Sequence, residues 1–295
     1  MNKMIFRSSV LIFGFGLILS ACGGKPETTT DASDEFAAAE SQITDNITTV
    51  VYDIPPPSQI PGLLERSGVE YNFELLNEES KADSYTSSSD KAALNLGVYA
   101  SDVGYLIAYE KVQEALNYMG TSRGLAEELG LTGTFEAAVI QQFEQNLDNR
   151  DSLVLLLNNT ISNSEEYLNN DKRQRTAALM LAGSLIEGLH ISCQLIKTYP
   201  SDLPDEVKNI VLSDLIRIIL EQEKSVSEVA KMLQSIDQKQ PVGELVTQFA
   251  SLQEQYKNIN ISEQIANNQG SLVLSDEFLV EITSIVEDIR STITK

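Results

Sequence analysis

The sequence predicts an all-α protein, an irregular antiparallel bundle of many helices, and three observations support this prediction. All eight prolines lie outside residues 62–199, so this long interval contains no residue that would break a helix. Apolar residues recur there at steps of three and four, which places them on one face of a helix. Runs that alternate with the period of a half-buried strand are few.

The helices are expected in chain order, joined by short connections that favour antiparallel neighbours. A first helix is expected from Glu35 to about residue 50, because Pro55 and its neighbours prevent continuation. Residues 58–85 are expected to form short helical turns, and Ser89 or Asp90 is expected to cap the next helix. The following helices are expected near 90–109, 110–130, 134–148, 150–170 and 172–198.

Three further helices are expected in the last third of the chain. One begins after Asp202, with Pro204 in its first turn and an apolar stripe that continues to Ile236. Another is expected from about 241 to 257, and the last begins at Asp276. The last carries apolar residues at steps of four, three and four, a face that must pack against a neighbour: Phe278, Ile282, Ile285 and Ile289.

A helical repeat is the alternative architecture. Residues 108–130 faintly resemble the helix-turn-helix unit of tetratricopeptide repeats. No second copy follows at the period of that repeat, which favours the irregular bundle.

The beginning of the chain is typical of an export signal. Lys3 and Arg7 precede an apolar run of ten residues, 10–19. This run is shorter than the roughly 20 residues that span a bilayer as a helix, so it indicates a secretory signal. The tetrad that overlaps its last residue, Leu19-Ser20-Ala21-Cys22, resembles the lipobox of bacterial lipoproteins.

The lipobox resemblance implies cleavage before Cys22, a diacylglycerol on its sulfur and acylation of the new amino terminus. The expected organisation is a lipoprotein signal peptide (1–21), a flexible tether (22–34) and a helical domain (35–295), with possible sub-bundles at 35–200 and 201–295. Several acyl chains together make a stable membrane anchor. Gly23, rather than aspartate, after the cysteine implies the outer membrane by the sorting habit of this family.

Composition excludes one class of partner. The chain has a formal net charge of −22 and lacks the clustered lysines and arginines that nucleic-acid binding requires. With Cys22 lipidated, Cys193 has no partner within the chain for a disulfide, so the core is expected to hold the fold.

One polar stripe on the helix expected at 90–109 is the main candidate site. Its members follow at steps of three and four: Asn95, Tyr99, Asp102, Tyr105 and Tyr109. Apolar neighbours suggest that Asp102 is partly buried, with tyrosine hydroxyls and an asparagine amide as its donors. The stripe is interpreted either as a small-ligand pocket or, in preference, as a structural network that fixes helix register.

The stretch 91–130, with its pattern GVYxxDxxY, resembles a group of uncharacterised helical lipoproteins of Bacteroidota. The resemblance covers about a quarter of the mature chain. It implies an exported, membrane-anchored, all-α protein, and it implies no activity.

The segment 186–193 contains the single histidine of the chain and its free cysteine. Glu187 and His190 have the E-x-x-H spacing of di-iron bundles, but such sites need two copies of the motif, so they are weak metal candidates. Gly188 to His190 also resembles the G-x-H-x-x-E motif of imelysin-like proteins, with Cys193 in place of the glutamate. His190 and Cys193 lack an orienting group and an oxyanion hole for nucleophilic catalysis. Gly183 and Gly188 suggest close contact with a neighbouring helix.

The expected function is therefore that of a non-enzymatic envelope lipoprotein, an interaction or scaffold module that docks to another envelope protein. A small-molecule or ion binder is the first alternative, and a metal-dependent or imelysin-like exported enzyme is the second. No catalytic residue and no cofactor is expected. The sequence leaves the oligomeric state and the membrane face open.

Overall fold

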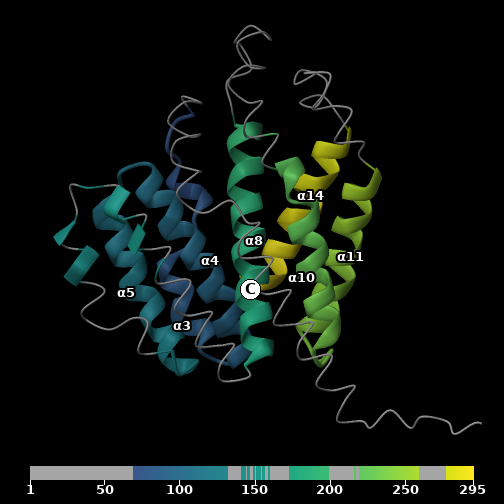
Figure 1. The fold of residues 1–295 in the computed structure, drawn as a ribbon, viewed down its shortest axis with the longest axis horizontal. Helices are drawn as coiled ribbons and strands as arrows, with labels where there is room; N and C mark the ends of the chain where they lie inside the picture. Colours follow the sequence, from purple (N-terminus) through teal and green to yellow (C-terminus); the bar gives the residue numbers. More distant parts are fainter. Residues whose placement is uncertain are drawn as a thin grey trace, which may run out of the picture.

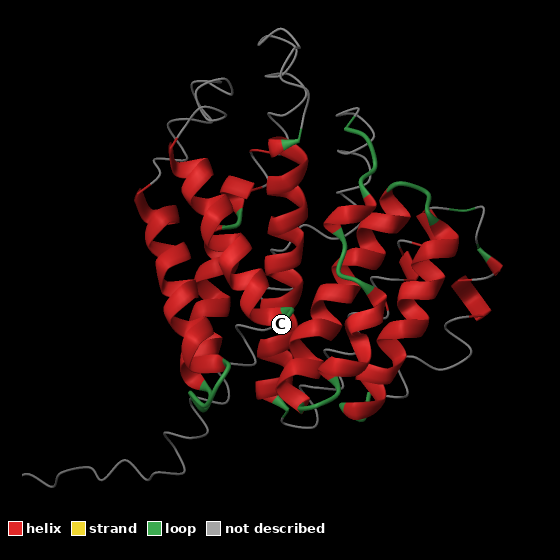
Figure 2. Ribbon diagram, turned by 180° about the vertical axis from the view of Figure 1, so that it is seen from behind, coloured by secondary structure: helices red, strands yellow, loops and turns green. Residues whose placement is uncertain are grey.

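The computed structural model describes residues 69–131, 173–198, 219–258 and 277–295, with Ile216 and scattered residues between 141 and 159. Within these residues the protein is all-α, built of helices and short 3-10 turns without a strand (Figure 2). The predicted signal peptide, Cys22, the tether and the helix from Glu35 lie outside the described residues. The helices expected at 134–148 and 150–170 lie largely outside them too.

The described elements, in chain order, are η1 (Phe73–Leu75), η2 (Glu79–Lys81), α3 (Ala82–Tyr85), α4 (Ser89–Ala108), α5 (Val112–Glu128), α8 (Gln174–Lys197), α10 (Glu223–Ser235), α11 (Val242–Asn258) and α14 (Glu277–Ile293). The predicted helices that fall on α4, α5, α8 and α11 begin and end within two residues of these bounds, and α14 begins one residue after the predicted start at Asp276. The capping prediction was wrong by one residue, because Ser88 is the N-cap and its side chain accepts the N–H of Lys91.

Helix α8 lies at the centre of the bundle, with α4 and α5 on one side and α10 and α11 on the other (Figure 1). It is also the one described helix that is long and apolar enough to cross a membrane, but 72% of its apolar window is buried inside the bundle. The core of the protein therefore accounts for its hydrophobicity. Helix α14 packs against both α8 and α11.

Two glycines bring α4 and α8 into backbone contact. A Cβ added at Gly97 would lie 2.0 Å from the carbonyl oxygen of Met180, and one at Gly183 would lie 1.9 Å from that of Leu94. Only glycine permits such an approach. The predicted close contact at Gly183 is thus confirmed. The same prediction for Gly188 was wrong, because nothing lies within 4 Å of a Cβ built there.

The pair α4 and α8 runs parallel, unlike the antiparallel arrangement expected of the bundle. Arg175, at the start of α8, forms a bidentate ion pair with Asp90, at the start of α4, at 2.6 and 2.8 Å. Further along both helices, Asp102 lies next to Glu187. The short connections that dictate antiparallel packing join consecutive helices, whereas α5 and residues 132–172 separate these two in the chain.

Candidate polar site on helix α4

The polar stripe of α4 faces the first described segment of the chain. We call this segment, Val69–Glu78, the strap; it contains η1 and otherwise has no regular secondary structure. The Tyr109 hydroxyl donates to the carbonyl of Val69 at 2.9 Å, and the Tyr99 hydroxyl donates to that of Glu78 at 2.8 Å. Between them, the N–H of Asn72 donates to the Tyr105 hydroxyl at 3.0 Å. The stripe therefore supplies hydrogen-bond partners to a backbone that has only the short η1 turn as regular structure.

The five predicted stripe residues do share one side of α4. Asn95, Tyr99, Asp102 and Tyr105 are buried, and Tyr109 is partly exposed. Their hydrogen bonds differ from the expected ones, however. Neither the tyrosines nor Asn95 donates to Asp102; its donor is the N–H of Asn77 in the strap, 3.2 Å from Oδ2. The expectation was wrong because the sequence does not reveal that a segment some 25 residues earlier in the chain lies over the stripe.

The end of the chain is held at the other end of the stripe. The Asn95 side-chain amide donates to the carbonyl of Ile293 at 3.0 Å, and the Tyr85 hydroxyl donates to that of Thr294 at 3.1 Å. The Lys91 ammonium donates to the carbonyl of Lys295 at 3.2 Å. Side chains on and beside α4 thus fix two backbone segments that are distant from it in sequence.

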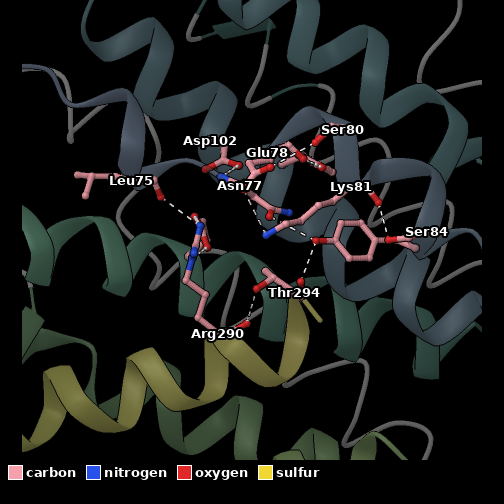
Figure 3. Close-up of polar contacts among 12 residues, drawn as sticks. Leu75, Asn77, Glu78, Ser80, Lys81, Ser84, Asp102, Arg290 and Thr294 are labelled. Carbon is pink, nitrogen blue, oxygen red and sulfur yellow. Dashed lines mark hydrogen bonds and ion pairs between the residues drawn. The ribbon is translucent and has the colours of Figure 1, made fainter.

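Asp102 belongs to a buried charged cluster that spans three helices. Arg290, from α14, binds the Glu187 carboxylate of α8 in a bidentate manner, at 2.6 and 2.8 Å. The same guanidinium donates to the carbonyl of Leu75 in the strap at 3.1 Å. Glu187 and Asp102 are fully buried and lie close enough for the charge of Glu187 to act on Asp102. Figure 3 shows Leu75 to the left of the Arg290 side chain and Asp102 and Asn77 above it.

Burial controls the protonation of this cluster. It raises the pKa of Asp102 well above its usual value, and the charge of Glu187 adds to the rise while Arg290 opposes it. Burial also raises the pKa of Glu187, against the guanidinium that holds it ionised. The raised pKa of Asp102 favours its protonated form, which leaves the ion pair of Arg290 with Glu187 as the charged part of the cluster.

The tyrosines around the cluster form two contacting groups. Tyr71 of the strap stacks on Tyr105 at 5.7 Å between ring centroids and contacts Tyr109 at 5.5 Å. Tyr99 contacts Tyr85 and Tyr118, at 6.4 and 5.9 Å. Burial is the main cause that raises the pKa of each hydroxyl, so the rings serve as neutral packing groups at neutral pH.

The predicted weak candidates on α8 do not form a reactive centre. Burial, helped by the charge of Arg290, lowers the pKa of His190 to about 3, so the imidazole stays neutral at physiological pH. Burial raises the pKa of Cys193 to about 12, and its thiol contacts Thr283. A thiol in this state is a poor nucleophile.

The geometry gives little support to a metal site at Glu187 and His190. Both carboxylate oxygens of Glu187 accept hydrogen bonds from Arg290, and a cation at that point would face the guanidinium charge. Within the described part of the chain, no group of three or more histidine, cysteine, aspartate or glutamate side chains is placed to hold a metal ion.

Sequence reasoning missed Arg290 and Asn77. Glu187 itself carried the signal for Arg290, because it is the only acidic residue between Arg175 and Lys197 in an otherwise apolar run. A single buried carboxylate needs a cation or several donors. Arg290, beside the apolar stripe of the last helix, is a natural candidate. No comparable signal marks Asn77, which contributes its backbone.

Comparison of the chain with protein-family models, curated proteins and solved structures finds no match. The class of protein is therefore the one that its own geometry defines. It is an all-α bundle around a central apolar helix, with a buried polar site that joins the strap, the chain end and three helices.

Proposed function

We propose that the chain is a lipid-anchored, non-enzymatic protein of the cell envelope that serves as a protein-interaction, scaffold or accessory module. One observation carries this proposal. In the described part of the chain, the side chains best suited to chemistry are engaged inside the bundle: Arg290 binds Glu187 and the strap, and Asp102 accepts the N–H of Asn77 in the strap. His190 and Cys193 have pKa values, about 3 and about 12, that suit neither acid-base nor nucleophilic work.

The proposed anchor is Cys22. Its support is the order of a positive leader, a short apolar run and the Leu-Ser-Ala-Cys tetrad, followed by a polar stretch with few residues able to form a core. We place the protein at the outer membrane, because Gly23 follows the cysteine. An acidic body, with a net charge of −22 for the whole chain, is repelled by anionic lipid heads and is compatible with a partner that binds it away from the membrane.

Two alternatives have less support. A small-molecule or ion binder would use the stripe from Asn95 to Tyr109, but four of its five side chains are buried, and the strap and the chain end bind the stripe. A ligand would have to displace the strap. A metal-dependent or imelysin-like enzyme would need Glu187 and His190, whose neighbour is the Arg290 guanidinium.

The anchor is tested by metabolic labelling with radioactive palmitate in a bacterial host that processes lipoproteins. We expect label in the wild-type chain and none in Cys22→Ser, which should also leave the membrane fraction. Cys193→Ser is the matched control and should keep both label and location, because that thiol is buried. Label that persists in Cys22→Ser would contradict the proposed anchor.

The interaction role is tested by crosslinking in intact cells, followed by purification of the chain. We expect one envelope protein in a reproducible, near-stoichiometric ratio, retained when His190→Ala or Cys193→Ser is used as bait. Elemental analysis and mass spectrometry of the same preparation provide the contrast. A stoichiometric metal or small molecule, with no protein partner, would favour the alternatives.

A further inference from the structure

We propose that the surface beneath the strap is a docking site for an extended, cationic segment of a partner protein, and that the strap occupies this site within the chain. The strap-binding surface consists of the five side chains that bind the strap backbone: Tyr99, Asp102, Tyr105 and Tyr109 of α4 and Arg290 of α14. This site gives the proposed interaction module its place of contact, and it rests on that proposed function.

The strap is bound as an extended peptide would be. The strap-binding surface contacts N–H and carbonyl groups of the strap, at distances of 2.8 to 3.4 Å. Backbone groups are common to every sequence, so another extended segment could form the same bonds. The selective part is apolar, since Val69, Leu75 and Leu76 are buried whereas Phe73 is 53% exposed. A partner segment with apolar residues at the buried positions would therefore fit this surface.

The strap leaves part of this surface without a hydrogen-bond partner. Asp102 is fully buried, and its Oδ1 receives no N–H or O–H from any group in the described part of the chain. Asn77 lies beside it and binds Oδ2 through its backbone N–H (Figure 3). The Nδ2 of the same asparagine is buried and has no acceptor among the described groups. Because a buried polar atom without a partner is costly, a better donor in the place of Asn77 would bind more tightly.

The charges around Asp102 indicate that this donor should be a cation. Glu187 and Arg290 form a bidentate ion pair with each other, so an ionised Asp102 is left without a positive partner. The raised pKa of Asp102 has the same origin, because burial and the charge of Glu187 outweigh Arg290. The strap contains three glutamates and no lysine or arginine. A basic side chain in the place of Asn77 would supply both the missing donor and the missing charge.

The attached strap makes the site selective for such a segment. The strap contains no α-helix, whereas the surface beneath it belongs to packed helices, with α4 and α8 in backbone contact through Gly97 and Gly183. A segment joined to the protein by a short linker competes at an effective concentration of about 1 mM. A neutral segment that binds as the strap does would therefore compete poorly. A segment that also pairs with Asp102 has the additional affinity that displacement requires.

The test is the binding of synthetic peptides to the purified full-length chain, measured by fluorescence polarisation. One peptide has the strap sequence, residues 69–78, and the other is the same peptide with Asn77→Arg. The chain carries Leu75→Ser and Leu76→Ser, which remove two buried side chains of the strap and so lower its competition. We expect the Asn77→Arg peptide to bind roughly tenfold more tightly than the strap peptide, or better, as close charge pairs at interfaces do.

The control variants change one carboxylate at a time. Asp102→Asn should bring the affinities of the two peptides to within about twofold of each other, because the arginine loses its partner. Asp288→Asn removes an exposed carboxylate of α14 and should keep the preference, which separates pairing at Asp102 from general attraction to an acidic protein. Each ratio compares two peptides on one chain, so a general loss of stability does not imitate the effect. If the double serine variant does not fold, the same ratio is measured on the wild-type chain at millimolar peptide.

Two results would overturn the proposal: equal binding of the two peptides, and a preference for the Asn77→Arg peptide that survives Asp102→Asn. Neither measurement involves lipid or a native partner. An envelope protein that crosslinks equally well to the wild type and to Asp102→Asn would place docking elsewhere, which overturns this site and leaves the proposed function standing. A peptide preference lost in Asp102→Asn, with no envelope protein captured from cells, would support the site and contradict the proposed function.

Discussion

The two sides of α8 are built on different principles. On the α4 side, two glycines place backbones in contact, and six tyrosines and two buried carboxyl groups lie between the strap and the helices. Arg290 reaches this cluster from the polar face of α14. On the other side, α10, α11 and α14 present regular apolar stripes. That of α11 is Val242, Leu245, Phe249, Leu252 and Tyr256, at alternating steps of three and four.

This difference separates two sources of stability. Apolar stripes on the α11 side stabilise the fold in proportion to the area they bury, and another apolar side chain of similar volume can replace most of their residues. The α4 side depends on specific partners, because a buried carboxylate or carbonyl that loses its donor costs more than the bond contributed. We therefore expect single substitutions to be more damaging on the α4 side.

Arg290→Met should have the largest effect. It leaves Glu187 buried beside Asp102 without a cation and removes the donor to Leu75, and breaking a buried pair in this way costs about 3–5 kcal/mol. The measurement is the free energy of unfolding in urea. Lys197→Met is the matched control, because its ion pair with Glu287 is exposed and should contribute less than about 1 kcal/mol. Equal losses of unfolding free energy in the two variants would show that the buried cluster stabilises the protein no more than an exposed ion pair does.

Gly183→Ala should have the second-largest effect and lower the free energy of unfolding by about 1–3 kcal/mol or more. Its Cβ would overlap the carbonyl of Leu94 and push α4 away from α8. Gly188→Ala, five residues later on the same helix, meets open space. It should stabilise the protein by about 0.5–1 kcal/mol through helix propensity alone. If Gly183→Ala also stabilised the protein, that result would contradict the close backbone contact between α4 and α8.

The same contrast explains what the sequence could predict. Apolar periodicity and the positions of proline determine where a helix begins and ends, so the bounds of α4, α5, α8 and α11 and the start of α14 were predicted closely. In α14, the expected stripe is borne out at Ile282 and Ile289, which are fully buried, and at Ile285, which is partly buried. The side chain of Phe278 lies outside the described residues. Periodicity reports the face of a helix, and this is sufficient where packing is apolar.

The candidate site was predictable only in part. The stripe from Asn95 to Tyr109 was found because polar residues at helical spacing stand out among apolar neighbours. Its partners were not found, because they are backbone groups of the strap and of the chain end, and such groups leave no mark in composition. The parallel pairing of α4 with α8 is likewise a tertiary property. It became visible only through Arg175 with Asp90 and Glu187 with Asp102.

The smallest expected loss of stability comes from removing one tyrosine hydroxyl on either side of α8. The hydroxyls of Tyr99 and Tyr256 each donate to a carbonyl at 2.8 Å, that of Glu78 in the strap and that of Ile219 before α10. Each carbonyl also accepts a backbone N–H, from Lys81 and from Gln222. Replacement by phenylalanine should therefore cost about 1 kcal/mol in both cases, measured by urea unfolding.

The two variants should differ in which segments exchange their backbone hydrogens faster. Hydrogen exchange in Tyr99→Phe should accelerate in the strap and leave α10 and α11 unchanged, because the strap is held by side chains and can open on its own. In Tyr256→Phe the acceleration should be confined to α10 and α11 and spare the strap. If Tyr99→Phe accelerated exchange throughout the bundle, the strap would be part of the cooperative core, and the distinction between the two sides would lose its physical basis.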